Sequence, residues 1–116
     1  MFLQTIASLR LSDLLRLMLS CTNAMVLTDK SGYIIHCNKE WCFLTGYCLR
    51  EVEGKQCGSI LHGTMTDIDE VYRCELLHNS ALPSIMTIVN YRKDGLMFVS
   101  TVTTSPVRGA YMSDGK

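Results

Sequence analysis

Residues 54–67, with the sequence GKQCGSILHGTMTD, hold the side chains best suited to chemistry. Cys57 stands three residues after Gly54, and His62 directly precedes Gly63. A thiol in a short polar segment can react with a small ligand, or it can fill space as a small apolar side chain. Both interpretations of Cys57 depend on the elements that position it.

The remaining cysteines and histidines indicate neither a metal site nor a catalytic centre. No CxxC pair occurs, which disfavours a zinc knuckle, and no signal peptide is recognised, which disfavours a disulfide framework. No histidine has a carboxylate at catalytic spacing, so no enzyme is predicted. His36 is expected to be an ordinary strand residue; His78, near a helix end, has haem ligation as an alternative. Free thiols in an intracellular compartment are expected at Cys21, Cys37, Cys42, Cys48, Cys57 and Cys74.

Length and charge predict one domain without an electrostatic preference for nucleic acid. The chain has 116 residues, and its 11 basic and 11 acidic side chains cancel. Residues 1–21 are apolar, but Arg10, Asp13 and Arg16 interrupt them. We therefore expect an amphipathic helix that flanks a domain over residues 22–116, and no membrane span.

Two β-hairpins are predicted, one in each half of the chain. Residues 23–29 and 33–37 are β-type runs joined by the turn sequence KSG, and residues 85–92 and 96–107 are longer runs joined by KDG. The predicted core comprises Val26, Leu27, Ile34, Trp41, Leu44, Leu61, Val71, Ile88, Val89, Phe98 and Val102.

Helices are predicted between the hairpins. Asn38 is a suitable N-cap for a helix that Gly46 ends, with Trp41 and Leu44 on its core face. A longer helix is expected over residues 67–79, because acidic residues at its start stabilise the positive N-terminal end of the helix dipole.

This order of elements, with NKEWCFLTGY, GKQCGSILHGTMTD and NYRKDG followed by SPVR, resembles a PAS domain over about residues 22–108. Within that class it is most similar to the LOV blue-light subfamily. The resemblance implies an α+β fold: an antiparallel sheet covered on one face by the helices of residues 38–79. In LOV domains the corresponding segment reads GxNCRFLQGxxTD. Its cysteine forms a reversible flavin adduct, and nearby amides and an arginine hold the ring and phosphate.

The resemblance implies a cofactor site made of five residues, with departures from the LOV pattern. Cys57 stands where the reactive cysteine would, but the run from it to Gly63 is one residue longer; counted from Gly63, Gly58 takes the cysteine's place and Ser59 the arginine's. No arginine in this loop is available to clamp a phosphate. The implied binding residues are Gln56 for the asparagine, Cys57, His62 for the glutamine, Asn90 for the first strand asparagine and Ser100 for the second.

Three functions follow as hypotheses. The first is a PAS sensory module that senses a ligand or mediates protein–protein contacts within a larger regulator, with no cofactor expected and a protein partner or homodimer formed through the N-terminal helix or the sheet. The second is a LOV photoreceptor that binds FMN and uses Cys57 as the adduct-forming residue. The third, disfavoured, is an enzyme or metal protein. For Cys57 we predict no stable adduct.

The resemblance also implies a last strand that lies in the middle of the sheet. Residues 113–116 have the sequence SDGK, which is typical of the turn before such a strand. We therefore predict that the domain lacks its central strand and exposes two sheet edges. The alternative is that the N-terminal segment or a partner chain fills the gap.

Overall fold

The computed structural model describes residues 2–3, 16 and 22–107. The part of the flanking helix expected at residues 4–15 and 17–21 lies outside these residues. In chain order the elements are β1 (Phe2–Leu3), β2 (Val26–Thr28), β3 (Ile34–Cys37), α2 (Lys39–Thr45), α3 (Leu49–Val52), α4 (Cys57–Leu61), α5 (Ile68–Asn79), β4 (Ser84–Tyr91) and β5 (Met97–Pro106).

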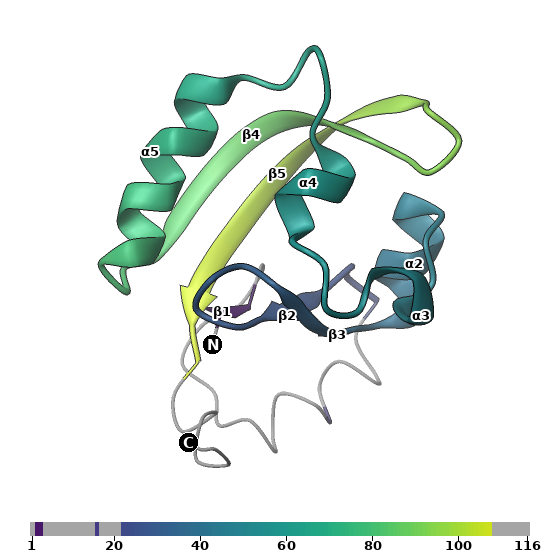
Figure 1. Ribbon diagram of the computed structural model, residues 1–116, viewed down its shortest axis with the longest axis horizontal. Helices are drawn as coiled ribbons and strands as arrows, with labels where there is room; N and C mark the ends of the chain where they lie inside the picture. The colour runs from purple at the N-terminus through teal and green to yellow at the C-terminus, as the bar shows by residue number, and fades with distance from the viewer. Residues whose placement is uncertain (1, 4–15, 17–21, 108–116) are drawn as a thin grey trace.

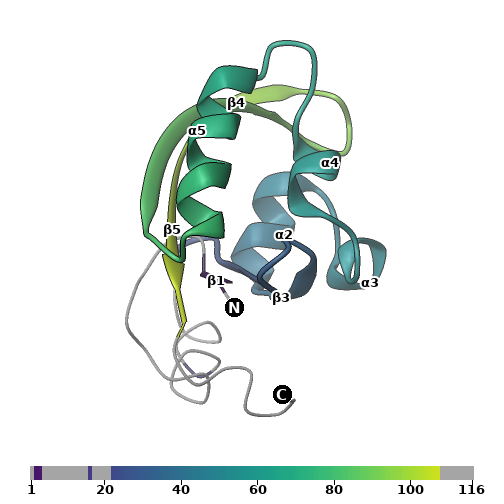
Figure 2. The same cartoon turned by 60° about the vertical axis from the view of Figure 1, so that its left-hand side comes forward.

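The strands form one antiparallel sheet in the order β3-β2-β1-β5-β4. The long β4–β5 hairpin curves over the molecule, and helices α2 to α5 lie together on its concave side (Figures 1 and 2). This is the α+β architecture that the sequence predicts. Among the described residues, no helix has both the length and the apolar character needed to cross a membrane.

Both predicted hairpins are present, and their turns have the expected chemistry. In the first, the Asp29 carboxylate accepts the backbone N–H groups of Ser31 and Tyr33 at 2.9 and 3.0 Å. Gly32 has a φ of 88°, which a residue with a side chain rarely adopts. In the second hairpin, the whole of β4 pairs with β5, from Ser84 opposite Thr104 to Tyr91 opposite Met97. A tight turn therefore fixes the register of each pair.

The centre of the sheet differs from the main expectation. Strand β1 lies between β2 and β5, with Phe2 opposite Thr28 and Pro106, and Leu3 opposite Leu27 and Ser105. The prediction of a sheet without a central strand is therefore wrong, and its alternative, an N-terminal segment in the gap, is confirmed. The assignment of residues 1–21 to a helix is likewise wrong at Phe2–Leu3. Helical periodicity did not decide the structure of these two residues, because the unpaired edges of β2 and β5 offer backbone partners.

Helix α2 has the predicted boundaries but a different buried face. The Asn38 side chain accepts the N–H of Trp41 at 3.0 Å, and Gly46 ends the helix in the left-handed region with a φ of 83°. Trp41 is buried as predicted, whereas Leu44 is 42% exposed. Thr45, one turn after Trp41, takes the inner position and donates its hydroxyl to the Trp41 carbonyl at 2.9 Å. The helix is rotated so that positions four apart face the core.

The main apolar core lies between the first hairpin and helices α2 to α4. Of the predicted core, Val71, Val89, Phe98 and Val102 are only partly buried. Among the described residues no three cysteine, histidine or acidic side chains form a metal-binding group. Cys37, Cys42, Cys48 and Cys74 are free thiols. The buried cluster comprises Val26, Ile34, Cys37, Trp41, Val52, Cys57 and Leu61.

Candidate functional site

A cavity of about 680 Å³ lies between the inner face of β4–β5 and helices α4 and α5. Its size is within the range of small-molecule and cofactor sites. Its wall comes from the segment resembling the LOV motif, from α5, from alternate residues of β4 and β5, and from the first hairpin. The lining residues include Lys30, Ser31, Gln56, Cys57, Gly58, Ser59, His62, Glu75, His78, Asn79, Met86, Ile88, Asn90 and Thr104.

Helix α4 positions the thiol and the histidine of this wall. The sequence did not predict it, because five residues that include Gly58 and Ser59 have weak helix propensity and no capping signal. The N–H of Cys57 donates to the Gly32 carbonyl at 3.1 Å, and Ile34 donates to the Lys55 carbonyl at 2.9 Å. These long-range hydrogen bonds to the first hairpin hold the start of α4 in place.

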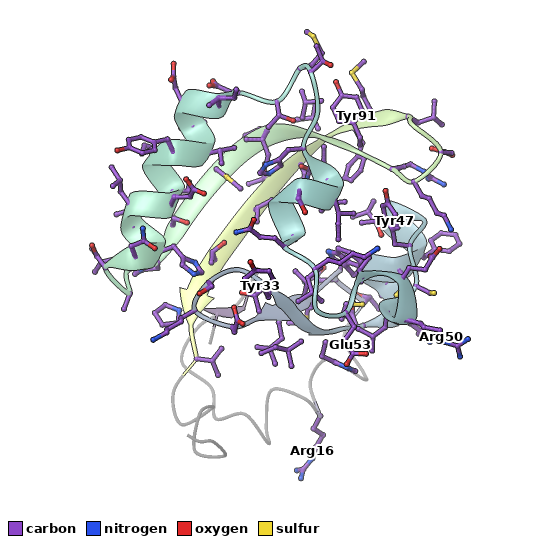
Figure 3. The ribbon with its side chains drawn as sticks, viewed as in Figure 1. Arg16, Tyr33, Tyr47, Arg50, Glu53 and Tyr91 are labelled. Atoms are coloured by element: carbon purple, nitrogen blue, oxygen red, sulfur yellow. The ribbon has the colours of Figure 1, made fainter. Side chains whose placement is uncertain are left out.

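Asn90 is the clearest sign of a binding site. Its side chain lies in the cavity wall, it is only 4% exposed, and its Oδ1 has no hydrogen-bond partner. An unpartnered buried carbonyl costs roughly 1–3 kcal/mol. Neighbouring Tyr91 instead lies beside the loop that follows α4, where its hydroxyl oxygen accepts the N–H of Met65 at 2.9 Å (Figure 3). The side chain of Asn90 is thus available to accept a hydrogen bond from a ligand in the cavity.

Cys57 belongs both to the cavity wall and to the apolar core. It is 7% exposed and packs in the cluster that contains Val26, Ile34 and Trp41. Gly58, the residue that takes the cysteine's place when the motif is counted from Gly63, also lines the cavity. The insertion is therefore accommodated within the first turn of α4, and both positions stay at the wall.

His62 lies one turn after Gly58 and folds back toward it. A Cβ added at Gly58 would lie 2.9 Å from Cε1 of His62, so a larger residue there would displace the ring. Burial lowers the pKa of His62 below its usual 6.5, and the Coulomb attraction of Glu75 on α5 opposes this shift. At neutral pH the ring is therefore a neutral donor and acceptor at the wall.

The two other residues implied by the resemblance have different positions. Gln56 is exposed at the edge of the cavity, where its Nε2 donates to the Ser31 carbonyl at 3.2 Å. Ser100 pairs with Ile88 across the hairpin and so shares the inner face, but it is not among the cavity-lining residues. The structure therefore brings together Gln56, Cys57, His62 and Asn90, and leaves Ser100 outside.

Several lining residues were not singled out from the sequence. Met86 on β4 and Thr104 on β5 lie on the inner face of the long hairpin. The signal available for them was that residues two apart on a strand share a face, so Met86 lies on the same face as Asn90. Lys30 and Glu75 come from a turn and a helix surface. Nothing in the sequence marks these two as neighbours of the same cavity, because their proximity depends on the packing of α5 beside the first hairpin.

Comparison with known proteins agrees with this architecture. The PAS domain family matches residues 22–114. The chain is 30% identical over 76 residues to the blue-light-activated histidine kinase 1 of Erythrobacter litoralis, which covers 66% of this chain and 21% of that protein. It is 33% identical over 86 residues to a blue-light photoreceptor of Listeria monocytogenes, which covers 72% of this chain and 34% of that protein.

A solved structure gives the same result for the fold. The dark structure of the LOV domain of the photoreceptor aureochrome1 superimposes with a TM-score of 0.72 at 26% identity, over 87% of this chain and 72% of that one. The chain belongs to the PAS domain family, and its relatives named here are LOV-containing or blue-light-sensing proteins. It spans about a fifth to a third of the length of the two curated relatives.

Proposed function

We propose that this chain is the sensory domain of a longer signalling protein and that its cavity binds a flat heteroaromatic ligand of the flavin type without a covalent bond. The observation that carries the proposal is the buried, unpartnered Oδ1 of Asn90 in the wall of a cavity of about 680 Å³. A ring N–H would satisfy this oxygen, and Ile88 and Met86 on the same strand offer apolar contact to a ring face. The proposal replaces the expectation that no cofactor is bound.

Similarity to blue-light receptors supports the same ligand class, and it keeps light sensing as the alternative use of the site. A flavin would supply light absorption or redox chemistry when bound. The chain's own contribution would be an amide acceptor at Asn90, a neutral imidazole at His62 and the apolar side chains of Met86 and Ile88.

We propose that Cys57 does not bond stably to the flavin. Its sulfur packs in an apolar cluster that includes Trp41, and the run from Cys57 to Gly63 is one residue longer than in the LOV motif. Its closeness to the cavity keeps the covalent alternative testable.

The test is absorbance of the purified chain after expression with excess riboflavin. A yellow preparation whose colour is lost in Asn90→Leu supports the proposal. Thr87→Leu is the matched control, because Thr87 lies on the outer face of the same strand and bonds to Thr101 at 3.1 Å. A colourless wild-type preparation would remove the flavin and leave an interaction module.

Blue light and mass spectrometry separate the covalent alternative. We expect neither reversible bleaching nor a light-dependent mass increase on the Cys57 peptide. Either signal, if abolished by Cys57→Ser, would make the chain a LOV photoreceptor with Cys57 as the reactive residue.

A second candidate function is self-association through the sheet. On its outer face Ile85, Met97 and Val99 are exposed apolar side chains, 62%, 59% and 72% exposed. Met97 and Val99 lie near one end of the hairpin and Ile85 near the other. Exposed apolar side chains on one sheet face can form an interface. We expect the wild-type chain to be dimeric by light scattering and Val99→Glu to be monomeric; equal masses for both would exclude this face.

A further inference from the structure

The ionisable side chains around the cavity set a limit on the charge of its ligand. Among the described lining residues, Lys30 is the one side chain with a permanent positive charge and Glu75 the one with a permanent negative charge at neutral pH. The lining histidines are His62, whose pKa is lowered by burial, and His78. His78 Nε2 lies 2.7 Å from the Lys30 carbonyl; since a carbonyl only accepts, this nitrogen carries a hydrogen. The formal charges of lysine and glutamate cancel.

A phosphate monoester needs more positive charge than this wall offers. It carries nearly two negative charges near neutral pH and is usually held by arginine forks. None of the described arginines lines the cavity. Arg73 gives two bonds of 2.9 Å to the Glu70 carboxylate and one of 2.7 Å to the Ile85 carbonyl. Arg50 points outward from α3, at the edge of the molecule (Figure 3).

The rest of the rim suits hydroxyl groups. Ser31, Ser59 and Asn79 line the cavity with neutral polar side chains. Such groups can exchange hydrogen bonds with a sugar alcohol chain. A phosphate would lose part of its hydration beside a wall whose lysine and glutamate charges cancel, and it would gain no net positive charge in return.

We propose that the cavity selects a flavin without a phosphate group, riboflavin rather than FMN. This inference rests on the proposed function, because it names the member of the ligand class that the site accepts. The apolar wall and Asn90 receive the ring, and the neutral rim receives the ribityl chain.

The experiment titrates lumiflavin, riboflavin and FMN with the full chain in the dark. The quenching of flavin fluorescence measures binding. We expect riboflavin to bind about tenfold or more tightly than FMN, because the phosphate loses hydration at a wall that offers it no net positive charge. Ser59→Arg and Glu75→Gln should each narrow the ratio by improving FMN binding. The matched control is Glu53→Gln, which removes an equal charge from an exposed residue outside the cavity wall.

The outcomes are distinct for the two proposals. FMN that binds as tightly as riboflavin, or more tightly, overturns the selectivity and leaves flavin binding intact. Failure of all three flavins to bind overturns the selectivity and the proposed function together. A riboflavin preference that Glu53→Gln changes as much as Glu75→Gln would show that it comes from overall charge and would also overturn the proposed site.

Discussion

Two buried asparagines show how differently the two halves of this molecule are built. Asn38 and Asn90 are 5% and 4% exposed. The Asn38 side chain accepts N–H groups of Met25 and Trp41 at 2.9 and 3.0 Å and donates to the Asn23 carbonyl at 2.8 Å. The Oδ1 of Asn90 has no partner. The side-chain amide of Asn38 is hydrogen-bonded within the packed core, whereas the side chain of Asn90 lies in the cavity wall.

The surroundings of each asparagine explain the difference. Asn38 stands between β3 and α2, beside the cluster around Trp41 and Val52, where large apolar side chains fill the space. Asn90 stands on β4 opposite Phe98, and its side chain lies in the cavity wall on the same face as Met86 and Ile88. Helix α5 places one fully buried side chain, Cys74, on this side. The half around Asn38 stabilises the domain by close packing, whereas the half around Asn90 leaves the space of the proposed binding site.

The largest expected effect is in the half around Asn38. Trp41→Ala should lower the free energy of unfolding by about 3–5 kcal/mol, because a buried indole is replaced by a cavity. Urea unfolding followed by circular dichroism measures it. Phe43→Ala, on the same helix but 85% exposed, should change stability by less than about 0.5 kcal/mol. Similar losses for both variants would mean that the rotation of α2 is wrong.

Replacing the two asparagines by leucine should give opposite results. Asn38→Leu removes an N-cap and leaves buried backbone groups unpartnered, so we expect a loss of roughly 2–3 kcal/mol. Asn90→Leu removes an unpartnered polar group, so the ligand-free domain should be unchanged or up to about 1 kcal/mol more stable. Urea midpoints of both variants, measured without flavin, test the comparison directly. A large loss for Asn90→Leu would show that this amide has a structural partner.

The strand in the centre of the sheet can be tested at its backbone. Leu3→Pro removes an N–H between β2 and β5 and should cost roughly 1–3 kcal/mol. Leu3→Ala keeps the N–H and separates the backbone effect from that of the side chain. Hydrogen exchange should show lost protection at Leu27 and Ser105 in the proline variant. Unchanged exchange there would contradict the pairing of β1.

The smallest expected effect is the pH dependence that His62 contributes. Burial lowers its pKa in the folded state below 6.5, so the unfolded chain binds more protons as the pH falls through 6.5. This contribution to stability is therefore present above pH 6.5 and is lost below it. Urea midpoints at pH 7.5 and 5.5 should fall further in the wild type than in His62→Gln. Equal falls in both proteins would remove His62 as a cause.

Local sequence determined the elements whose signals lie within a few residues. The turns KSG and KDG, the cap residue Asn38 and the helix end at Gly46 were all predicted, because turn and cap preferences depend on neighbouring backbone groups. Motif spacing was also enough to indicate the PAS family and four residues of the cavity wall.

Tertiary structure decided the rest, because burial and strand pairing depend on residues far apart in the chain. Leu44 and Thr45 are adjacent, and either could face the core. In the structure α2 packs on the first hairpin with Thr45 buried and Leu44 exposed. Helix α4 forms where weak local propensity is overcome by bonds to the first hairpin. Phe2–Leu3 became the central strand because the edges of β2 and β5 lacked a partner. Asn90 and Ser100 share the inner face of the curved β4–β5 hairpin, yet Asn90 lines the cavity and Ser100 does not (Figure 1). The sequence alone could not predict this difference.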